Sequence, residues 1–75
     1  MSKLPVISGR EIVKVLTRIG FEIVGRSGSH IRLKRRRDKE LLIVIVPMHR
    51  ELAKGTLRSI LRQANLTHED LLRLL

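Results

Sequence analysis

The stretch GSHIRLKRRRDKELLIVIVP, residues 28–47, decides the fold of this chain. Apolar and cationic residues alternate over 30–36, which is typical of a strand with one buried and one exposed face. After a polar turn at residues 37–40, the run 41–46 is rich in β-branched residues and favours another strand. Pro47 ends that strand because it has no amide hydrogen to donate. The stretch therefore predicts two adjacent strands joined by a short turn.

The residues before this stretch predict a helix and a first strand. Ser8 and Glu11 have the spacing of a capping box, in which each side chain bonds the backbone amide of the other residue. Apolar residues then recur at helical spacing, so we expect a helix over residues 9–19. Residues 21–26 predict the first strand, and the serine–glycine–serine sequence at 27–29 predicts a turn.

The residues after the third strand predict two helices. Gly55 and Thr56 open a helix of about ten residues with one apolar face, and Asn65 is a suitable residue for its end. Thr67 caps a short third helix. The order α-β-β-β-α-α predicts an α+β fold, a three-stranded antiparallel sheet with helices packed on one face. The length of 75 residues fits one domain, residues 1–75.

The charge of the chain favours a polyanionic partner. Lysine and arginine total 16 against 7 acidic residues, a formal net charge of +9, which is typical of proteins that bind nucleic acid. The single aromatic residue, Phe21, argues against base stacking, so we expect contacts to phosphate and sugar. The chain has no cysteine for a disulfide, and no segment resembles a signal peptide or a membrane span. We expect a soluble, cytoplasmic protein.

Alternation along the second strand predicts a basic face. Side chains two residues apart share a face of a strand and lie about 7 Å apart, near the spacing of phosphates along a nucleic-acid strand. The residues that share this face are His30, Arg32, Lys34 and Arg36. The residues expected to add positive charge to the same region are Arg26, Arg35, Arg37 and Lys39. A charged face that contacts only solvent is the alternative interpretation.

His30, at the start of the basic face, is the candidate catalytic residue. From the sequence, we expect the surrounding cations to disfavour protonation of its imidazole, so that it can act as a base near neutral pH. In RNA this base can take the proton of a ribose 2′-hydroxyl, whose oxygen then attacks its own phosphate while arginine and lysine stabilise the added charge. The reaction needs neither a metal nor a protein nucleophile, so no metal site or cofactor is expected. The alternative is an exposed histidine without a role.

Two further segments are candidates for contact with RNA. His49 follows the third strand, where it either protonates the leaving 5′-oxygen, contacts phosphate, or bonds only to backbone. The amides at the start of the second helix favour phosphate, although Gly55 and Thr56 also fit simple helix capping. The RNA-binding residues predicted from the sequence are Arg26, Ser29, Arg32, Lys34, Arg36, Lys54, Gly55 and Thr56.

The apolar run at residues 41–46 is open to two interpretations. It lacks strict alternation, so both of its faces have the composition of buried faces. It is either a covered core strand or a surface for strand pairing, with a partner protein or with a second copy in a homo-oligomer.

Several short motifs occur in a recognisable order along nearly the whole chain. They are Leu4-Pro5 with Ser8-Gly9-Arg10-Glu11, then Gly20-Phe21, Gly28-Ser29-His30, Val46-Pro47-Met48-His49 and Gly55-Thr56-Leu57-Arg58-Ser59-Ile60-Leu61. In this order and spacing, the chain resembles the HicA (YcfA-like) toxins, small mRNA interferases of type II toxin–antitoxin pairs.

The resemblance implies a fold similar to the double-stranded-RNA-binding domain and endoribonuclease activity on mRNA. It implies that the histidine of the Gly-Ser-His motif, here His30, is catalytic, and that a HicB-type antitoxin neutralises the toxin. The chain departs from the family at Asn65, where a glycine is more usual, and at Asp70-Leu71, which replaces a more common Glu-Phe. A non-catalytic double-stranded-RNA-binding module is the alternative function.

Overall fold

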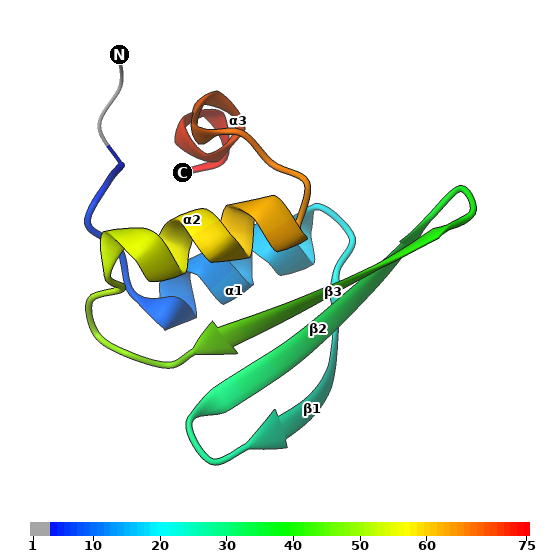
Figure 1. Ribbon diagram of the computed structural model, residues 1–75, viewed down its shortest axis with the longest axis horizontal. Coiled ribbons are helices and arrows are strands. Elements are labelled where there is room, and N and C mark those ends of the chain that lie inside the picture. The colour runs from blue at the N-terminus through cyan, green and yellow to red at the C-terminus, as the bar shows by residue number, and fades with distance from the viewer. Residues whose placement is uncertain (1–3) are drawn as a thin grey trace.

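The computed structural model describes residues 4–75, which contain three helices and three strands in the predicted order (Figure 1). The elements are α1 (Gly9–Arg18), β1 (Glu22–Ser27), β2 (His30–Arg37), β3 (Glu40–Pro47), α2 (Lys54–Gln63) and α3 (His68–Leu74). The strands form one antiparallel sheet in the order β1-β2-β3. The helices lie on one side of this sheet (Figure 1), which confirms the predicted α+β fold. Within the described residues, no helix is long and apolar enough to cross a membrane.

The observed element boundaries lie close to those predicted. The capping box before α1 is present, and the Ser8 hydroxyl accepts the amide hydrogen of Glu11 at 3.0 Å. Thr67 caps α3 in the same way. Helix α2 begins at Lys54, one residue earlier than predicted, and its N-cap residue Ala53 makes no side-chain hydrogen bond to the first turn. The local signals that place α1 and α3 are therefore stronger than the one that places α2.

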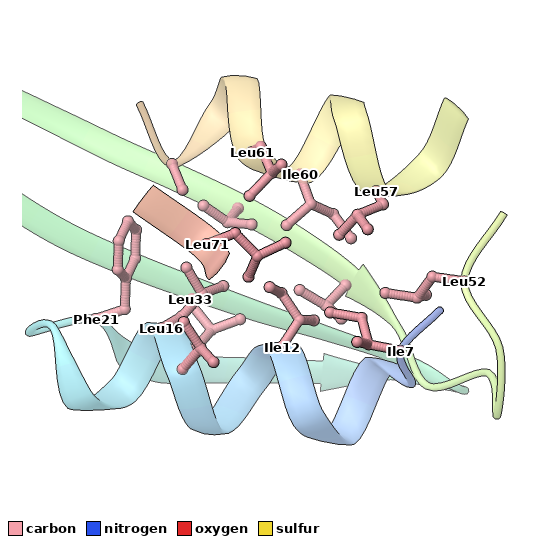
Figure 2. Packing of buried hydrophobic residues seen from close by; sticks show 14 of the residues in the cluster. Ile7, Ile12, Leu16, Phe21, Leu33, Leu52, Leu57, Ile60, Leu61 and Leu71 are labelled. Carbon is pink, nitrogen blue, oxygen red and sulfur yellow. The ribbon is translucent and has the colours of Figure 1, made fainter. Parts of the chain in front are cut away.

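One face of the sheet forms the floor of the hydrophobic core. On β2, Ile31 and Leu33 are buried, and their partners across the β2–β3 ladder, Val46 and Val44, are buried as well. Figure 2 shows apolar side chains of the three helices meeting over this face. Further members of the core are Leu4, Ile7, Ile12, Val15, Leu16, Phe21, Leu52, Leu57, Ile60, Leu61, Ala64 and Leu71. The residues that alternate with them on β2 lie on the opposite, exposed face.

The start of α1 packs directly against the end of β3. The Gly9 amide donates to the carbonyl oxygen of His49 at 2.9 Å, and the Leu52 amide donates to that of Ile7 at 2.9 Å. A Cβ on residue 9 would overlap the carbonyl oxygen of Pro47, so this close approach requires glycine. These contacts fix the path of the loop after β3, which presents the exposed His49 beside the start of α1.

Helix α2 covers part of the outer edge of β3. The Ile45 amide points away from β2 and donates to Oε1 of Gln63 at 3.0 Å. Alternate residues of a strand direct their amides to the same side, so Leu41 and Ile43 direct theirs to the open edge. Strand pairing was one of two interpretations of the run 41–46, and only the part of the run near the β2–β3 turn presents an open edge to a partner strand.

Candidate nucleic-acid interface

The exposed face of the sheet carries the predicted row of cations on its central strand. The members of this row are His30, Arg32, Lys34 and Arg36, and all four are exposed. None of the four forms an ion pair with another residue in the described part of the chain. Their charges are therefore available to an external anion, and the predicted alternation of β2 is confirmed.

An apolar row on β3 runs beside these cations. The partners of Arg32, Lys34 and Arg36 across the ladder are, in this order, Ile45, Ile43 and Leu41. These apolar side chains are 39–49% exposed. Long cationic side chains can lay their aliphatic stems along apolar neighbours while the charged group stays in water. The exposed face thus combines charge and apolar surface in adjacent rows.

His30 lies in a hollow at the end of the sheet nearest the β1–β2 turn. Its backbone has Ser27 of β1 as partner on one side and Pro47 of β3 on the other. The hollow has a volume of about 210 Å³ and is lined by Gly25, Arg26, Ser27, His30, Arg32 and Ile45. We call it the His30 hollow. No cluster of three histidine, aspartate or glutamate side chains that could hold a metal ion occurs here or elsewhere in residues 4–75.

Gly25 makes room for the guanidinium group of Arg32. The β1–β2 register shifts between Ile23 and Gly25, and a Cβ on Gly25 would lie 3.0 Å from Nη2 of Arg32. A Cβ at position 25 would therefore make the guanidinium group of Arg32 shift by a few tenths of an ångström. A glycine inside a strand indicates a bulge or a close approach, and this is the sequence signal that identifies the position.

A second hollow lies beside the first, at the start of α1. It has a volume of about 540 Å³ and is lined by Ser8, Arg10, Arg26, Met48, His49 and Arg50. We call it the Arg10 hollow. Because Arg26 lines both hollows, they are neighbours. His30 and His49 therefore lie in adjacent hollows and do not share one.

The remaining predicted contacts lie outside both hollows. Ser29 is in the β1–β2 turn, where its carbonyl oxygen accepts the amide hydrogen of Met48 at 2.7 Å. The residues at the start of α2 that were predicted to bind phosphate, Lys54, Gly55 and Thr56, follow the loop that carries His49. The structure thus brings Arg32 to the face that carries His30, and it places Arg26 at the boundary of the two hollows with its side chain on the helix side of the sheet. It does not bring these four residues to His30.

Two arginines that were expected to add charge near His30 lie on the other side of the sheet. Arg35 and Arg37 have the opposite alternation to Lys34 and Arg36, so their side chains point toward the helices. There they line another hollow together with Ile19, Asn65, Leu66, Asp70, Arg73 and Leu74. Lys39 is in the turn at the opposite end of the hairpin from His30. The expectation for these residues was therefore wrong.

Sequence reasoning missed several residues of the two hollows. They are Gly25, Ser27 and Ile45 beside His30, and Ser8, Arg10, Met48 and Arg50 beside His49. Arg10 and Arg50 carry the charge that is relevant to an anion, but they lie far apart in the sequence. No local pattern joins them, because only the packing of α1 against the end of β3 brings them together.

The chain matches a known protein family over most of its length. The family model described as "HicA toxin of bacterial toxin-antitoxin" matches residues 9–66. This range begins with α1, contains the whole sheet and ends after α2, so it includes every lining residue of both hollows except Ser8. A search of curated proteins found no match.

Proposed function

Because the chain belongs to the HicA toxin family of bacterial toxin–antitoxin systems, we propose that it is an endoribonuclease that cleaves mRNA, with His30 as the catalytic residue. The observation that carries this proposal is the exposed position of His30 in a hollow that Arg26 and Arg32 also line, with no carboxylate among its lining residues. An imidazole that can exchange a proton thus shares the exposed face of the sheet with the guanidinium group of Arg32, which can bind a phosphate. With mRNA as the substrate, the protein acts in the cytoplasm.

In the proposed reaction, the unprotonated imidazole of His30 accepts the proton of a ribose 2′-hydroxyl. The 2′-oxygen forms a bond to the adjacent phosphorus, and the bond from phosphorus to the 5′-oxygen of the next nucleotide breaks. The leaving 5′-oxygen takes a proton from the imidazolium or from water. The products are a 2′,3′-cyclic phosphate and a 5′-hydroxyl, and no step requires a metal ion. DNA is not a substrate because it lacks the 2′-hydroxyl.

The cations around His30 have two separate tasks in this proposal. Arg32, on the same face of the sheet as His30, stabilises the negative charge that develops on the phosphate in the transition state. Lys34 and Arg36 continue the row along β2 and hold the phosphate backbone of the bound strand. More distant parts of the RNA would bind the other predicted contacts, which are Ser29, Lys54, Gly55 and Thr56.

The test is an RNA cleavage assay in EDTA with the parent protein, His30→Ala and the control His68→Ala, which replaces a histidine of α3 outside both hollows. We expect His30→Ala to cleave about 10²–10⁴-fold more slowly, the usual contribution of a general acid or base. The control and the parent protein should cleave equally, and all three should bind RNA. Undiminished cleavage by His30→Ala would show that another group is the base, and loss of cleavage in EDTA would show that a metal is needed.

The second candidate function is a non-catalytic double-stranded-RNA-binding module. The observation in its favour is that the exposed cations extend along β2 beyond the His30 hollow, to Lys34 and Arg36. Such a module binds duplex RNA with a steep dependence on salt and leaves it intact. Binding without cleavage by the parent protein in the same assay would replace the enzyme proposal with this one.

The toxin family implies an antitoxin partner, and we propose that a HicB-type antitoxin covers the exposed face of the sheet. An acidic surface fits the cations of β2, and an extended segment fits the open edge of β3 at Leu41 and Ile43. A partner seated there would keep RNA away from His30. A second copy of the chain is a poorer occupant, because two faces with the same row of cations repel each other.

A further inference from the structure

The Arg10 hollow contains positive charge that the proposed catalytic step does not use. Its lining includes three arginines, Arg10, Arg26 and Arg50, together with His49. No carboxylate lines the hollow, and none of the three arginines forms an ion pair within the described residues. Like charges gathered in this way repel one another, so a bound anion would stabilise the arrangement.

Two acidic residues directly follow these arginines in the sequence, Glu11 and Glu51, and neither lines the hollow. Glu11 follows Arg10 in the first turn of α1, but its Oε1 accepts the amide hydrogen of Ser8 at 2.9 Å. The capping box therefore directs this carboxylate to the start of the helix instead of to the arginines. Arg10 keeps its charge for an external partner.

The hollow is formed by three segments whose backbones the fold holds in place. Arg10 belongs to α1, Arg26 belongs to β1, and Arg50 belongs to the loop after β3. The hydrogen bond from the Gly9 amide to the carbonyl oxygen of His49 joins the first of these segments to the third. The site is therefore organised before an anion binds, which reduces the entropy lost on binding.

We propose that the Arg10 hollow is a phosphate subsite for the RNA strand, next to the nucleotide whose 2′-hydroxyl is deprotonated by His30. Arg26 lines both hollows, and its pairing with Ile31 directs its side chain to the helix side of the sheet. A strand that leaves the His30 hollow therefore reaches the Arg10 hollow around this end of the sheet. Guanidinium groups bind phosphate oxygens through paired, charge-assisted hydrogen bonds, and His49 adds a further donor in the same place. This inference rests on the proposed function, since it identifies the part of the mRNA strand that lies beside the cleaved bond.

The first measurement is RNA binding by proteins that cannot cleave. The variant Arg10→Ala/Arg50→Ala and the control Arg18→Ala/Arg58→Ala, each in a His30→Ala background, remove two exposed cations. The control positions lie outside both hollows. The affinity for a labelled single-stranded RNA oligonucleotide is measured over a range of salt concentrations. The logarithm of the binding constant falls linearly with the logarithm of the salt concentration, and each phosphate contact with a single strand adds about 0.7 to the magnitude of this slope. Loss of two contacts should therefore lower the slope by about 1.4 in Arg10→Ala/Arg50→Ala, and the control should keep the slope of the parent.

The second measurement is cleavage with His30 intact. The cleaved bond is first mapped in an RNA oligonucleotide, and substrates are then extended by successive nucleotides on either side of that bond. We expect extension on one side to raise kcat/KM about tenfold for the parent protein and for Arg18→Ala/Arg58→Ala. The variant Arg10→Ala/Arg50→Ala should lose this gain, because the added phosphates no longer find their partners.

The outcomes separate the subsite from the catalytic proposal. Equal salt slopes and equal gains from extension in both double variants would overturn the subsite and leave the role of His30 intact. The expected change in slope without any cleavage by the parent protein would overturn the endoribonuclease proposal alone. Unchanged RNA binding together with lost antitoxin binding would assign the hollow to the protein partner and overturn the phosphate subsite.

Discussion

The backbone of Gly9 lies against the carbonyl group of Pro47, so closely that no side chain fits between the start of α1 and the end of β3. This contact links the two hollows of the candidate interface. Arg10 follows Gly9 in the chain, and His30 is the partner of Pro47 across the β2–β3 ladder. A change in the approach of α1 to β3 would therefore move the arginines of one hollow relative to the histidine of the other.

The first prediction concerns this contact. Gly9→Ala is expected to lower the free energy of unfolding by about 3 kcal/mol, because the methyl group meets backbone atoms that cannot move aside. Gly55→Ala is the matched control, since an added Cβ there meets no atom within 4 Å. Alanine favours the helix, so the control should gain about 0.5–1 kcal/mol. Urea unfolding measures both, and equal midpoints for Gly9→Ala and the parent protein would contradict the prediction.

The second prediction concerns Gly25 and Arg32. Gly25→Ala is expected to slow RNA cleavage by up to about tenfold, because the Cβ shifts the guanidinium group of Arg32 within the His30 hollow. In an Arg32→Ala background, the same substitution should have little further effect, since no guanidinium group is left to displace. Cleavage rates of the two single variants and the double variant form the test. Additive losses would show that Gly25 acts independently of Arg32.

The third prediction concerns the pH dependence of stability at α3. A hydrogen bond from the Thr67 backbone amide, followed by one from Arg73, holds the pKa of Asp70 below its ordinary value of 3.8. The unfolded chain therefore binds this proton at a higher pH than the folded chain, so Asp70 stabilises the fold above pH 3.8. The contribution disappears as the pH falls through the lowered pKa.

The measurement compares urea unfolding of the parent protein and Asp70→Asn over a series of pH values. The variant should be less stable at neutral pH, and the difference should shrink as the pH falls below 3.8. Titration of the other carboxylates affects both proteins and cancels in the difference. A stability difference that stays constant with pH would show that the carboxylate charge has no part in capping α3.

The fourth prediction concerns the proposed antitoxin surface. Ile43 on β3 and Leu72 on α3 are both 42% exposed, so they form a matched pair. Ile43→Asp is expected to weaken binding of a HicB-type antitoxin by about tenfold or more, because it removes apolar contact and repels an acidic partner. Leu72→Asp should bind the antitoxin with the affinity of the parent protein. Calorimetric titration measures both, and sedimentation velocity of the parent protein shows whether a second copy occupies this edge instead.

The sequence alone determined the order of the elements and the face on which His30 lies. The alternation of Ile31 and Leu33 with cationic residues is a local property of a strand, and one buried face is enough to orient it. Capping at Ser8 and Thr67 is equally local, since donor and acceptor are three residues apart. The predicted end of α2 at Asn65 is consistent with its positive φ of 59°.

The same alternation also exposes an error of interpretation. Arg35 and Arg37 were assigned to the His30 region for their charge, although their position in the strand already directed them to the other face. Charge counted along a sequence does not indicate a shared surface. In a strand, the parity of the position decides which side of the sheet a side chain occupies.

Only the tertiary structure decided which residues share a site. Arg10, Arg26 and Arg50 come from a helix, a strand and a loop, and they meet because α1 starts against the end of β3 at Gly9. Tertiary packing also places Gln63 of α2 at the edge of β3, where its side-chain oxygen accepts the amide hydrogen of Ile45. The periodicity that predicts a helix or a strand involves only residues that are close together in the sequence. The contacts described here depend instead on the packing of apolar faces from elements that are far apart in the chain.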